Sequence, residues 1–391
     1  MTDATVTPGS QSALRQANER RVVEVLRRDG TRTQAELARA TGLSAASVSN
    51  IVRGLRAAGT VSVRDTASNG RRARAVTLLR PPGAVLAVDF TVDGVAVGVG
   101  DSDGNLLARE EIGYDVAADP ERGVRRAAWL AEITLQRARI DLRTVSSAVA
   151  SVPGPVDPGT GEVGRISCVP RWTGFRPAEA LGERLGVPVV AENDANLAAL
   201  AERRIGAGEG AGHLIHLVIG EGVGAGIVLS GELFRGAGGT AGEIGHITLD
   251  PRGPVCRCGN RGCLETFVGA RYLLDMLPQN SEVARGPGGP RVADVVAAAR
   301  SGDLGSRRVI AEAGTALGQG LAIAANLFNP DRVTVGGDLA EAGELLLDPM
   351  ARAMELGALG SAREDLTLMS GALGRDAALY GALWTAAHVA L

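Results

Sequence analysis

The sequence predicts a small head of mixed helices and strands, followed by a large α/β body with two lobes. The first observation is an uneven distribution of charge. Residues 1–80 carry 14 arginines and 6 acidic residues, whereas the rest of the chain carries 27 arginines and 38 acidic residues. The second is the proline pair in the segment 80–83, which discourages helix and is typical of a domain boundary. The third is a strand–turn–strand pattern that occurs twice after residue 84, each time followed by helical segments.

Composition excludes several classes of protein. With 391 residues, the chain is longer than one ordinary domain, and 45% hydrophobic against 22% charged residues indicates a globular, ordered protein. No apolar run approaches the length of a membrane span, and the N-terminus lacks a signal-peptide core. Four cysteines, three of them clustered, do not suggest a disulfide framework, so we expect a cytoplasmic protein without a membrane partner.

The head contains a helix-turn-helix pattern. Residues 1–13 are polar and aperiodic, and we expect them to be flexible; a first helix is expected over 18–28. Thr33 and Glu36 have capping-box spacing and should open a second helix, and Gly42 permits the tight turn before a third. The third helix has apolar residues at i, i+3, i+4 and i+7, which places them on one buried face: Val48, Ile51, Val52 and Leu55.

Short and hydrogen-bonding side chains occupy the opposite face of this third helix, which allows it to enter a major groove. Strands over 61–63 and 75–79, joined by an arginine-rich tip at 69–74, predict a wing that contacts phosphates. We therefore expect residues 1–80 to form a winged helix-turn-helix domain that binds operator DNA; a packing module with a solvated basic hairpin is the alternative. The expected DNA-binding residues are Ser44, Ala45, Ser47, Ser49, Asn50, Arg53, Arg71, Arg72 and Arg74.

A metal site is indicated by the cysteine spacing. Cys256, Cys258 and Cys263 form a C-x-C-x4-C pattern, and His246 precedes it by ten positions. Three thiolates and one imidazole suit a closed tetrahedral zinc site; buried or reactive free thiols are the alternative. Cys168 stands apart in the sequence and is expected to be an ordinary buried thiol.

Two sets of strands with helices between them predict a cleft between two lobes. The first set is expected at 85–89, 95–99 and 106–112, and the second at 214–219 and 225–229. Helices are expected near 121–139 and 307–327.

Five motifs occur in a fixed order along the body: 152–157 (VPGPVD), 192–196 (ENDAN), 220–226 (GEGVGAG), 236–246 and 256–265. Together they resemble the ROK family of repressors, open reading frames and sugar kinases. The resemblance covers residues 84–391, and the head is similar to that of the family's repressor branch. It implies an actin-like, hexokinase-like two-lobed ATPase fold, with lobes at 81–191 and 192–375 and a C-terminal helix, 376–391, packed back on the first lobe.

The resemblance also implies roles for individual residues. His246, Cys256, Cys258 and Cys263 match the family's zinc ligands, so the zinc is expected to be structural. The expected sugar-binding residues are Asn193, Asp194, Glu243, His246 and Glu265. Asp194 matches the general base of the kinases, although as a residue at the start of a helix it is also a candidate N-cap.

Both phosphate loops depart from the kinase pattern. The turn after the first strand contains Val92 and Asp93 where kinases have glycines, and Glu221 replaces a hydroxyl donor in the second loop. A like-charge pair at ~4 Å costs about 4 kcal/mol at an effective dielectric constant near 20. We therefore expect no catalysis, and interpret the chain as a homodimeric or homotetrameric repressor released from DNA by a monosaccharide or sugar phosphate. A glucokinase-like sugar kinase with a regulatory head, and a DNA-bound scaffold with a vestigial pocket, are the alternatives.

Overall fold

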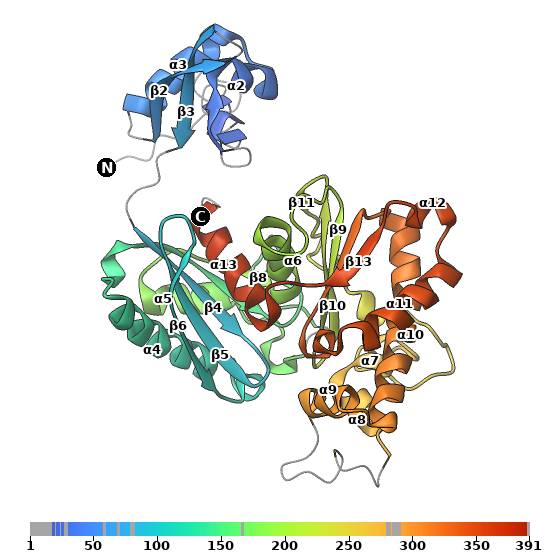
Figure 1. Ribbon diagram of the computed structural model, residues 1–391. Coiled ribbons are helices and arrows are strands. Elements are labelled where there is room, and N and C mark those ends of the chain that lie inside the picture. Colours follow the sequence, from blue (N-terminus) through green and yellow to red (C-terminus); the bar gives the residue numbers. More distant parts are fainter. Residues whose placement is uncertain are drawn as a thin grey trace. The chain divides into compact units, whose positions relative to one another are not determined.

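The computed structural model of the chain divides into two compact units, residues 1–83 and residues 84–391 (Figure 1). It describes residues 18–19, 21–23, 25–26, 30–57, 60–68, 71–78, 83–165, 168–278, 283 and 291–388. Residues 1–13, which we expected to be flexible, lie outside these ranges, and so do residues 69–70 of the expected wing tip. Among the described residues, no helix is long and apolar enough to cross a membrane.

The first unit is a helix-turn-helix with a small sheet. Its elements are β1 (Arg32–Thr33), α2 (Gln34–Thr41), α3 (Ala45–Ala57), β2 (Val61–Ser68) and β3 (Arg71–Leu78), with the strand order β1-β3-β2. Described residues between 18 and 26 are helical as well. The predicted capping box is confirmed, because the Glu36 backbone N–H donates to the Thr33 hydroxyl and the Thr33 N–H donates to the Glu36 carboxylate. Gly42 has the expected positive φ of 70°.

The wing strands are longer than the sequence predicted. We expected strands only at 61–63 and 75–79, where apolar residues alternate, but the antiparallel ladder runs from the Val61–Leu78 pair to the Ser68–Arg71 pair. Backbone hydrogen bonds carry this extension, because antiparallel pairing needs no apolar side chains once a ribbon has left the core. Residues 71 and 72 therefore lie within β3 and not in a turn.

The body contains two five-stranded mixed sheets with the same strand order. The first is β6-β5-β4-β7-β8 and the second is β11-β10-β9-β12-β13. In each, an antiparallel meander is followed by two parallel strands. The predicted internal repeat is thus present in the topology. The strands are β4 (Ala84–Phe90), β5 (Gly94–Gly100), β6 (Leu106–Gly113), β7 (Val145–Val152), β8 (Val189–Asn193), β9 (Leu214–Ile219), β10 (Val223–Leu229), β11 (Glu232–Leu233), β12 (Arg332–Gly336) and β13 (Thr367–Ser370).

Helices cover both sheets. The α-helices of the body are α4 (Pro120–Ala138), α5 (Pro177–Leu185), α6 (Asp194–Ile205), α7 (Glu265–Val268), α8 (Ala270–Asp275), α9 (Val292–Arg300), α10 (Leu304–Phe328), α11 (Glu344–Gly357), α12 (Gly360–Arg363) and α13 (Ala377–His388). Short 3-10 helices are η1 (Val116–Ala118), η2 (Leu142–Thr144), η3 (Pro170–Trp172), η4 (Ile244–His246), η5 (Asp338–Ala342) and η6 (Gly374–Asp376).

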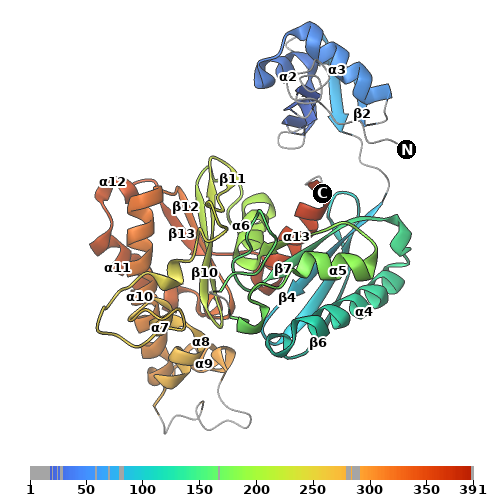
Figure 2. The same cartoon turned by 180° about the vertical axis from the view of Figure 1, so that it is seen from behind.

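Two helix layers enclose the first sheet. On one face, α4 and α5 pack against the strands (Figure 2). The core on this face includes Phe90, whose ring centroid lies 5.0 Å from that of Trp172. On the other face, Val85 and Ala87 of β4 contact Leu379 and Leu383 of α13. Alternate residues of β4 thus face opposite layers, as strand geometry requires.

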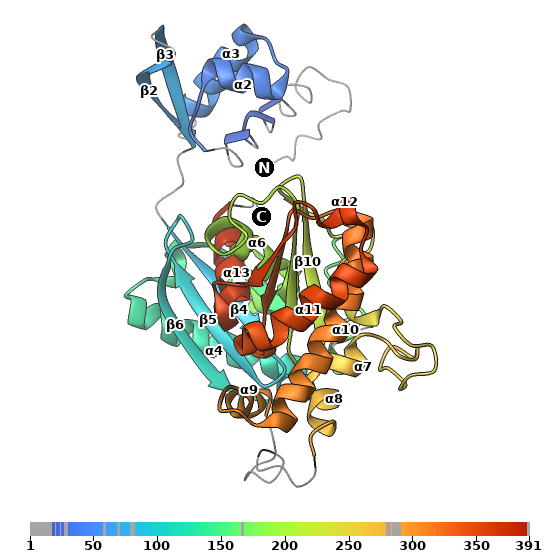
Figure 3. The ribbon, with the colours of Figure 1, turned by 45° about the vertical axis from the view of Figure 1, so that its right-hand side comes forward.

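Helix α6 connects the two sheets. It follows β8 directly and packs against α13 as well as against β9 and β10 of the second sheet. In the second lobe, α10 and α11 lie side by side (Figure 3). The start of α6 therefore lies where the two lobes meet, and the residues at the end of β8 are placed beside the second lobe.

Candidate functional site

The exposed side of α3 carries the residues that we expected to contact DNA. Val48, Ile51 and Val52 are buried in the head, and the Ser47 backbone N–H donates to the Ser44 hydroxyl at 3.1 Å, which caps the helix. Ser44, Ala45, Asn50 and Arg53 are exposed, and Ser47 and Ser49 are half-buried.

On the wing, Arg74 is exposed, and its Nε lies 4.0 Å from the Asp65 carboxylate. Arg71 and Arg72 belong to the same strand, β3. The sequence thus places arginines at positions 71, 72 and 74 of one strand of a two-stranded ribbon, which is suited to phosphate contacts.

The four predicted zinc ligands come together in the body. Their ligand atoms all lie within 4.8 Å of one another. The Cys258 and Cys263 sulfurs are 3.7 Å apart, and the Cys256 sulfur is 3.5 Å from His246 Nδ1. Two thiolates bound tetrahedrally at about 2.3 Å would be roughly 3.8 Å apart, so the donor set fits zinc. Because protein atoms supply all four positions, the zinc would be structural.

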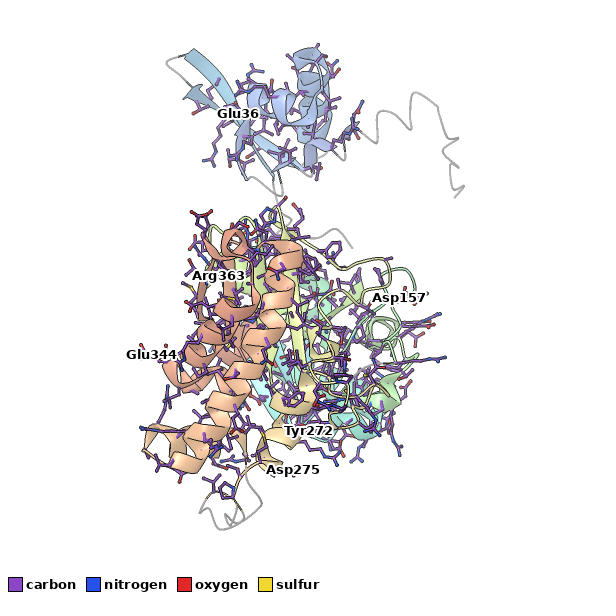
Figure 4. All side chains as sticks on the ribbon, turned by 90° about the vertical axis from the view of Figure 1, so that its right-hand side faces the viewer. Glu36, Asp157, Tyr272, Asp275, Glu344 and Arg363 are labelled. Carbon is purple, nitrogen blue, oxygen red and sulfur yellow. The ribbon has the colours of Figure 1, made fainter. Side chains whose placement is uncertain are left out.

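Local folding explains how distant ligands meet. His246 ends η4, and bridges between Thr248 and Cys263 and between Val255 and Arg261 close the cysteine loop. Tyr272 of α8, labelled in Figure 4, donates its hydroxyl to the Val255 carbonyl at 3.3 Å. Burial raises the pKa of the Cys263 thiol to about 12, so a bound cation is needed to stabilise the thiolate.

A cluster of carboxylates adjoins this metal centre. The Glu243 carboxylate lies 3.7 Å from Nε2 of His246, the ring nitrogen that faces away from the cysteines. Burial, with the neighbouring charges of Asp194 and Glu265, raises the pKa of Glu243 to about 7. Metal ligation at Nδ1 would fix the tautomer and orient Nε2 toward Glu243.

Asp194 lies at the start of α6. Its Oδ1 accepts from the backbone N–H of Ala195 at 2.8 Å and from the Asn193 amide at 3.0 Å. Burial, reinforced by Asp89, raises the pKa of Asp194 to about 7, and burial raises that of Asp89 to about 6. The sequence did not indicate Asp89 as a site residue, yet one of its buried oxygens has no hydrogen-bond partner among the described atoms.

The residue that caps α6 is Asn193, and not Asp194 as the alternative interpretation held. Asn193 Oδ1 accepts from the Asn196 N–H at 3.0 Å, while its Nδ2 donates to the Gly154 carbonyl and to Asp194. Both polar atoms of the Asn193 side chain therefore already have protein partners. Asp194 is left with one carboxylate oxygen for other contacts.

Glu265 is paired with an arginine that the sequence reasoning did not select. Arg257 Nε donates to Glu265 at 2.6 Å, and Arg257 NH2 donates to the Glu221 carbonyl at 2.9 Å. Arg257 stands between two zinc-ligating cysteines, so the metal loop is connected to the Glu221 loop through this guanidinium. Its position inside the C-x-C pattern was the only available signal.

Cys168, which we expected to be an ordinary buried thiol, is half-buried and lies beside the site. A side chain added at Gly222 would meet the Cys168 sulfur, a Glu265 oxygen and the Arg257 guanidinium, so these three groups converge on one point. Burial raises the pKa of the Cys168 thiol to about 11, which keeps it neutral. Its separation in sequence gave no indication of this placement.

The two stretches compared with phosphate loops have different surroundings. After β4, the chain turns through Thr91 to Gly94; the Thr91 hydroxyl donates to Asp93 and Phe90 is buried. Glu221 is exposed in the turn between β9 and β10. At the end of β12, a side chain on Gly337 would collide with the backbone of Ile219, so close packing explains that glycine.

A winged-helix head and a body of two repeated α/β sheets with a Cys3His site define a two-part protein that combines a DNA-binding domain with a sugar-kinase-like fold. The sequence pattern of the ROK family matches residues 85–389, and that of the MarR family matches residues 16–72. The chain therefore belongs to the ROK family and is a transcriptional regulator with a DNA-binding head.

Individual relatives fall in both branches of the family. The xylose repressor of Caldicellulosiruptor bescii is 28% identical over 354 residues, covering 88% of each chain. A ROK family transcriptional regulator that is a homologue of the E. coli MLC protein aligns with a TM-score of 0.77 and 26% identity, over 96% of this chain and 97% of the other. A ROK glucokinase from Streptomyces griseus, solved with glucose and AMPPNP, aligns with a TM-score of 0.67 and 31% identity, over 77% and 98%.

Zinc content tests the metal centre. We expect Cys258→Ser to reduce bound zinc well below one per chain and to lower the melting temperature, because three ligands cannot complete the tetrahedral set. Elemental analysis after exhaustive dialysis measures this. Cys168→Ser is the matched control and should retain zinc; full zinc content in Cys258→Ser would refute the ligand assignment.

The raised pKa of Asp194 predicts a pH-dependent effect on stability. A carboxyl with a pKa near 7 in the folded state binds protons that the unfolded chain has released, so its ionisation destabilises the fold as pH rises toward 7. Asp194→Asn should therefore raise the melting temperature more at pH 8 than at pH 5. Asp303→Asn is the control. The Ser306 N–H lowers the pKa of Asp303, so the difference in melting temperature between this variant and the unmodified chain should be the same at pH 5 and pH 8. A pH-independent difference for Asp194→Asn would contradict the interpretation.

Proposed function

We propose that this chain is a cytoplasmic repressor whose DNA affinity is controlled by a monosaccharide or sugar phosphate bound between the lobes. The observation that carries the proposal is the convergence of Asp194, Glu243 and Glu265 beside a Cys3His centre, in a chain that also has a helix-turn-helix head. The similarity to the xylose repressor over 88% of both chains supports a repressor that responds to a sugar.

The site has the chemistry that a neutral sugar requires. A carboxyl with a pKa near 7 can accept a hydrogen bond when ionised or donate one when protonated, and Asp194 and Glu243 both have this property. Nε2 of His246 provides a further polar atom whose orientation the metal would fix. These groups would meet adjacent hydroxyls of one ring, and Asp194 would use Oδ2, since its hydrogen bonds with Asn193 and Ala195 both end on Oδ1.

Regulation follows if the sugar binds two lobe arrangements unequally. A ligand shifts a conformational equilibrium only by its differential affinity for the two states. Contacts contributed by α6 on one side and by the loop of Glu243 on the other favour the arrangement in which both sides reach the sugar. In a dimer, such a change alters the separation of two heads that must match operator half-sites.

A second copy of this chain is the partner that the helix-turn-helix requires, because paired heads read paired half-sites. The second lobe exposes three leucines: Leu327, Leu356 and Leu359 are 72%, 92% and 66% exposed. Exposed large apolar side chains are suited to burial against another chain. We therefore propose a homodimer, or a tetramer built from dimers.

Loss of phosphoryl transfer is the second part of the proposal. Catalysis requires backbone N–H groups close to the phosphates. Val92 and Asp93 occupy the first loop, and the Glu221 carboxylate in the second would repel a triphosphate. The similarity to the Streptomyces griseus glucokinase and the perturbed pKa of Asp194, suited to a general base, favour the alternative of a residual kinase.

A direct test combines both activities. Fluorescence anisotropy of an operator duplex selected from a random library, titrated with monosaccharides and their 6-phosphates, should show release by at least one of them. A coupled assay with ATP and the same sugars should stay at background. ATP-dependent turnover that disappears in Asp194→Asn would establish the kinase alternative instead.

The head can be tested separately. Arg53→Ala should weaken operator binding by roughly ten- to a hundredfold, because an exposed guanidinium on the recognition helix is lost. Sugar binding to the body, measured by calorimetry, should be unchanged. Arg143→Ala, an exposed arginine of the body paired with Asp141, is the control and should bind DNA normally. Equal operator affinity of the Arg53→Ala and unmodified chains would exclude this residue from the interface.

A further inference from the structure

Arg235 and Glu192 form an ion pair next to the segment that carries Asp194, and neither residue was expected in the site. Arg235 Nε donates to Glu192 Oε2 at 2.5 Å. Glu192 is in β8 of the first sheet, and Arg235 follows β11 of the second, so the pair joins the two lobes. The Glu192 side chain is only 9% exposed, whereas that of Arg235 is 39% exposed.

The other oxygen of Glu192 organises the start of α6. Glu192 Oε1 accepts from the Asn193 backbone N–H at 2.9 Å and from the Asn196 amide at 2.9 Å. Asn193 in turn caps α6 and donates to Asp194. One buried carboxylate thus fixes the segment that carries Asp194.

Arg235 belongs to a loop that ends at Glu243. The Ala241 N–H donates to the Arg235 carbonyl at 3.1 Å, which closes the loop on itself. A side chain at Gly239 would collide with the Val156 carbonyl, so this loop also packs tightly against the first lobe. The Gly242 carbonyl accepts from the Ala225 N–H at 2.9 Å. This bond attaches Gly242, the residue before Glu243, to strand β10.

We propose that Arg235 and Glu192 are positioning residues for the sugar site: their ion pair sets the separation between Asp194 on α6 and Glu243 on the opposite loop. This inference rests on the proposed function. Neither residue reaches the ligand in this assignment. Both act through the backbone segments that carry the two ligand-binding carboxylates.

Electrostatics explains why the pair matters more than an ordinary surface ion pair. Exposed pairs contribute little, but removing one partner of a largely buried pair leaves an uncompensated charge. Without Arg235, the Glu192 carboxylate remains buried with the Asn193 N–H and the Asn196 amide as its described partners, and neither carries a positive charge. The predicted response is displacement of the start of α6, and therefore of Asp194.

The experiment measures sugar affinity in four full-length variants. The probe is whichever of D-glucose, D-xylose, N-acetyl-D-glucosamine and the 6-phosphates of the two hexoses binds the unmodified chain most tightly by calorimetry. Arg235→Ala and Glu192→Gln should each weaken binding at least tenfold, and Arg235→Lys, which keeps the charge, should recover at least threefold of that loss. Arg308→Ala removes an exposed arginine paired with Glu312 and should stay within twofold.

Melting temperature and operator affinity without sugar are measured in parallel. A lowered melting temperature with sugar affinity within twofold in Arg235→Ala would show a purely structural pair and overturn the assignment. If Arg235→Ala does not fold, the sugar affinities of Arg235→Lys and Glu192→Gln decide between the two roles. Sugar affinity within twofold of the unmodified chain in both variants would overturn the positioning assignment. If none of these sugars and neither of the two 6-phosphates binds the unmodified chain, the proposed function fails and this assignment fails with it.

Discussion

Closure of the Cys3His centre is the constraint on which the rest of the site depends. Glu243 lies three residues before the ligand His246, and Glu265 lies two residues after the ligand Cys263. Both carboxylates therefore flank a loop that contains two isolated β-bridges and no regular strand. A metal that joins the two ends of this loop would hold His246 at the end of η4 close to Cys263 before α7, which is the structural role typical of such sites.

Crowded carboxylates are tolerated here because each has a different means of stabilisation. Glu265 has a guanidinium partner in Arg257, Glu192 has Arg235, and Asp194 accepts N–H donors at the start of α6. Asp89, Asp194 and Glu243 also respond through raised pKa values. Buried acids with perturbed pKa values cluster at functional sites.

Position in the fold explains how one site can serve two kinds of relative. The carboxylate cluster lies at the start of α6, which packs against both α13 and the second sheet. Any relative movement of the lobes therefore changes the distances across this cluster. A kinase uses such closure to exclude water from a reaction, whereas a regulator can use the same closure to report that a ligand is bound.

Local signals made much of the chain predictable. The capping box at Thr33, the turn at Gly42, the apolar face of α3, the first three strands of the first sheet and the first two of the second follow from residue spacing, because neighbouring residues decide these features. The zinc ligands were found because three of the four lie within eight positions of one another. The wing strands were underestimated, since backbone pairing extended them beyond their apolar residues.

The sequence by itself determined which chemical groups are present: the metal-binding set, the acidic residues and a basic head. Only the tertiary structure decided which of these groups meet. It brought Cys168 and Arg257 to Glu265, Asp89 to Asp194, and Arg235 to Glu192 across 43 positions of the chain. The physical reason is that these contacts depend on how two sheets and α6 pack together, and no periodicity along the chain encodes the distance between residues on different sheets.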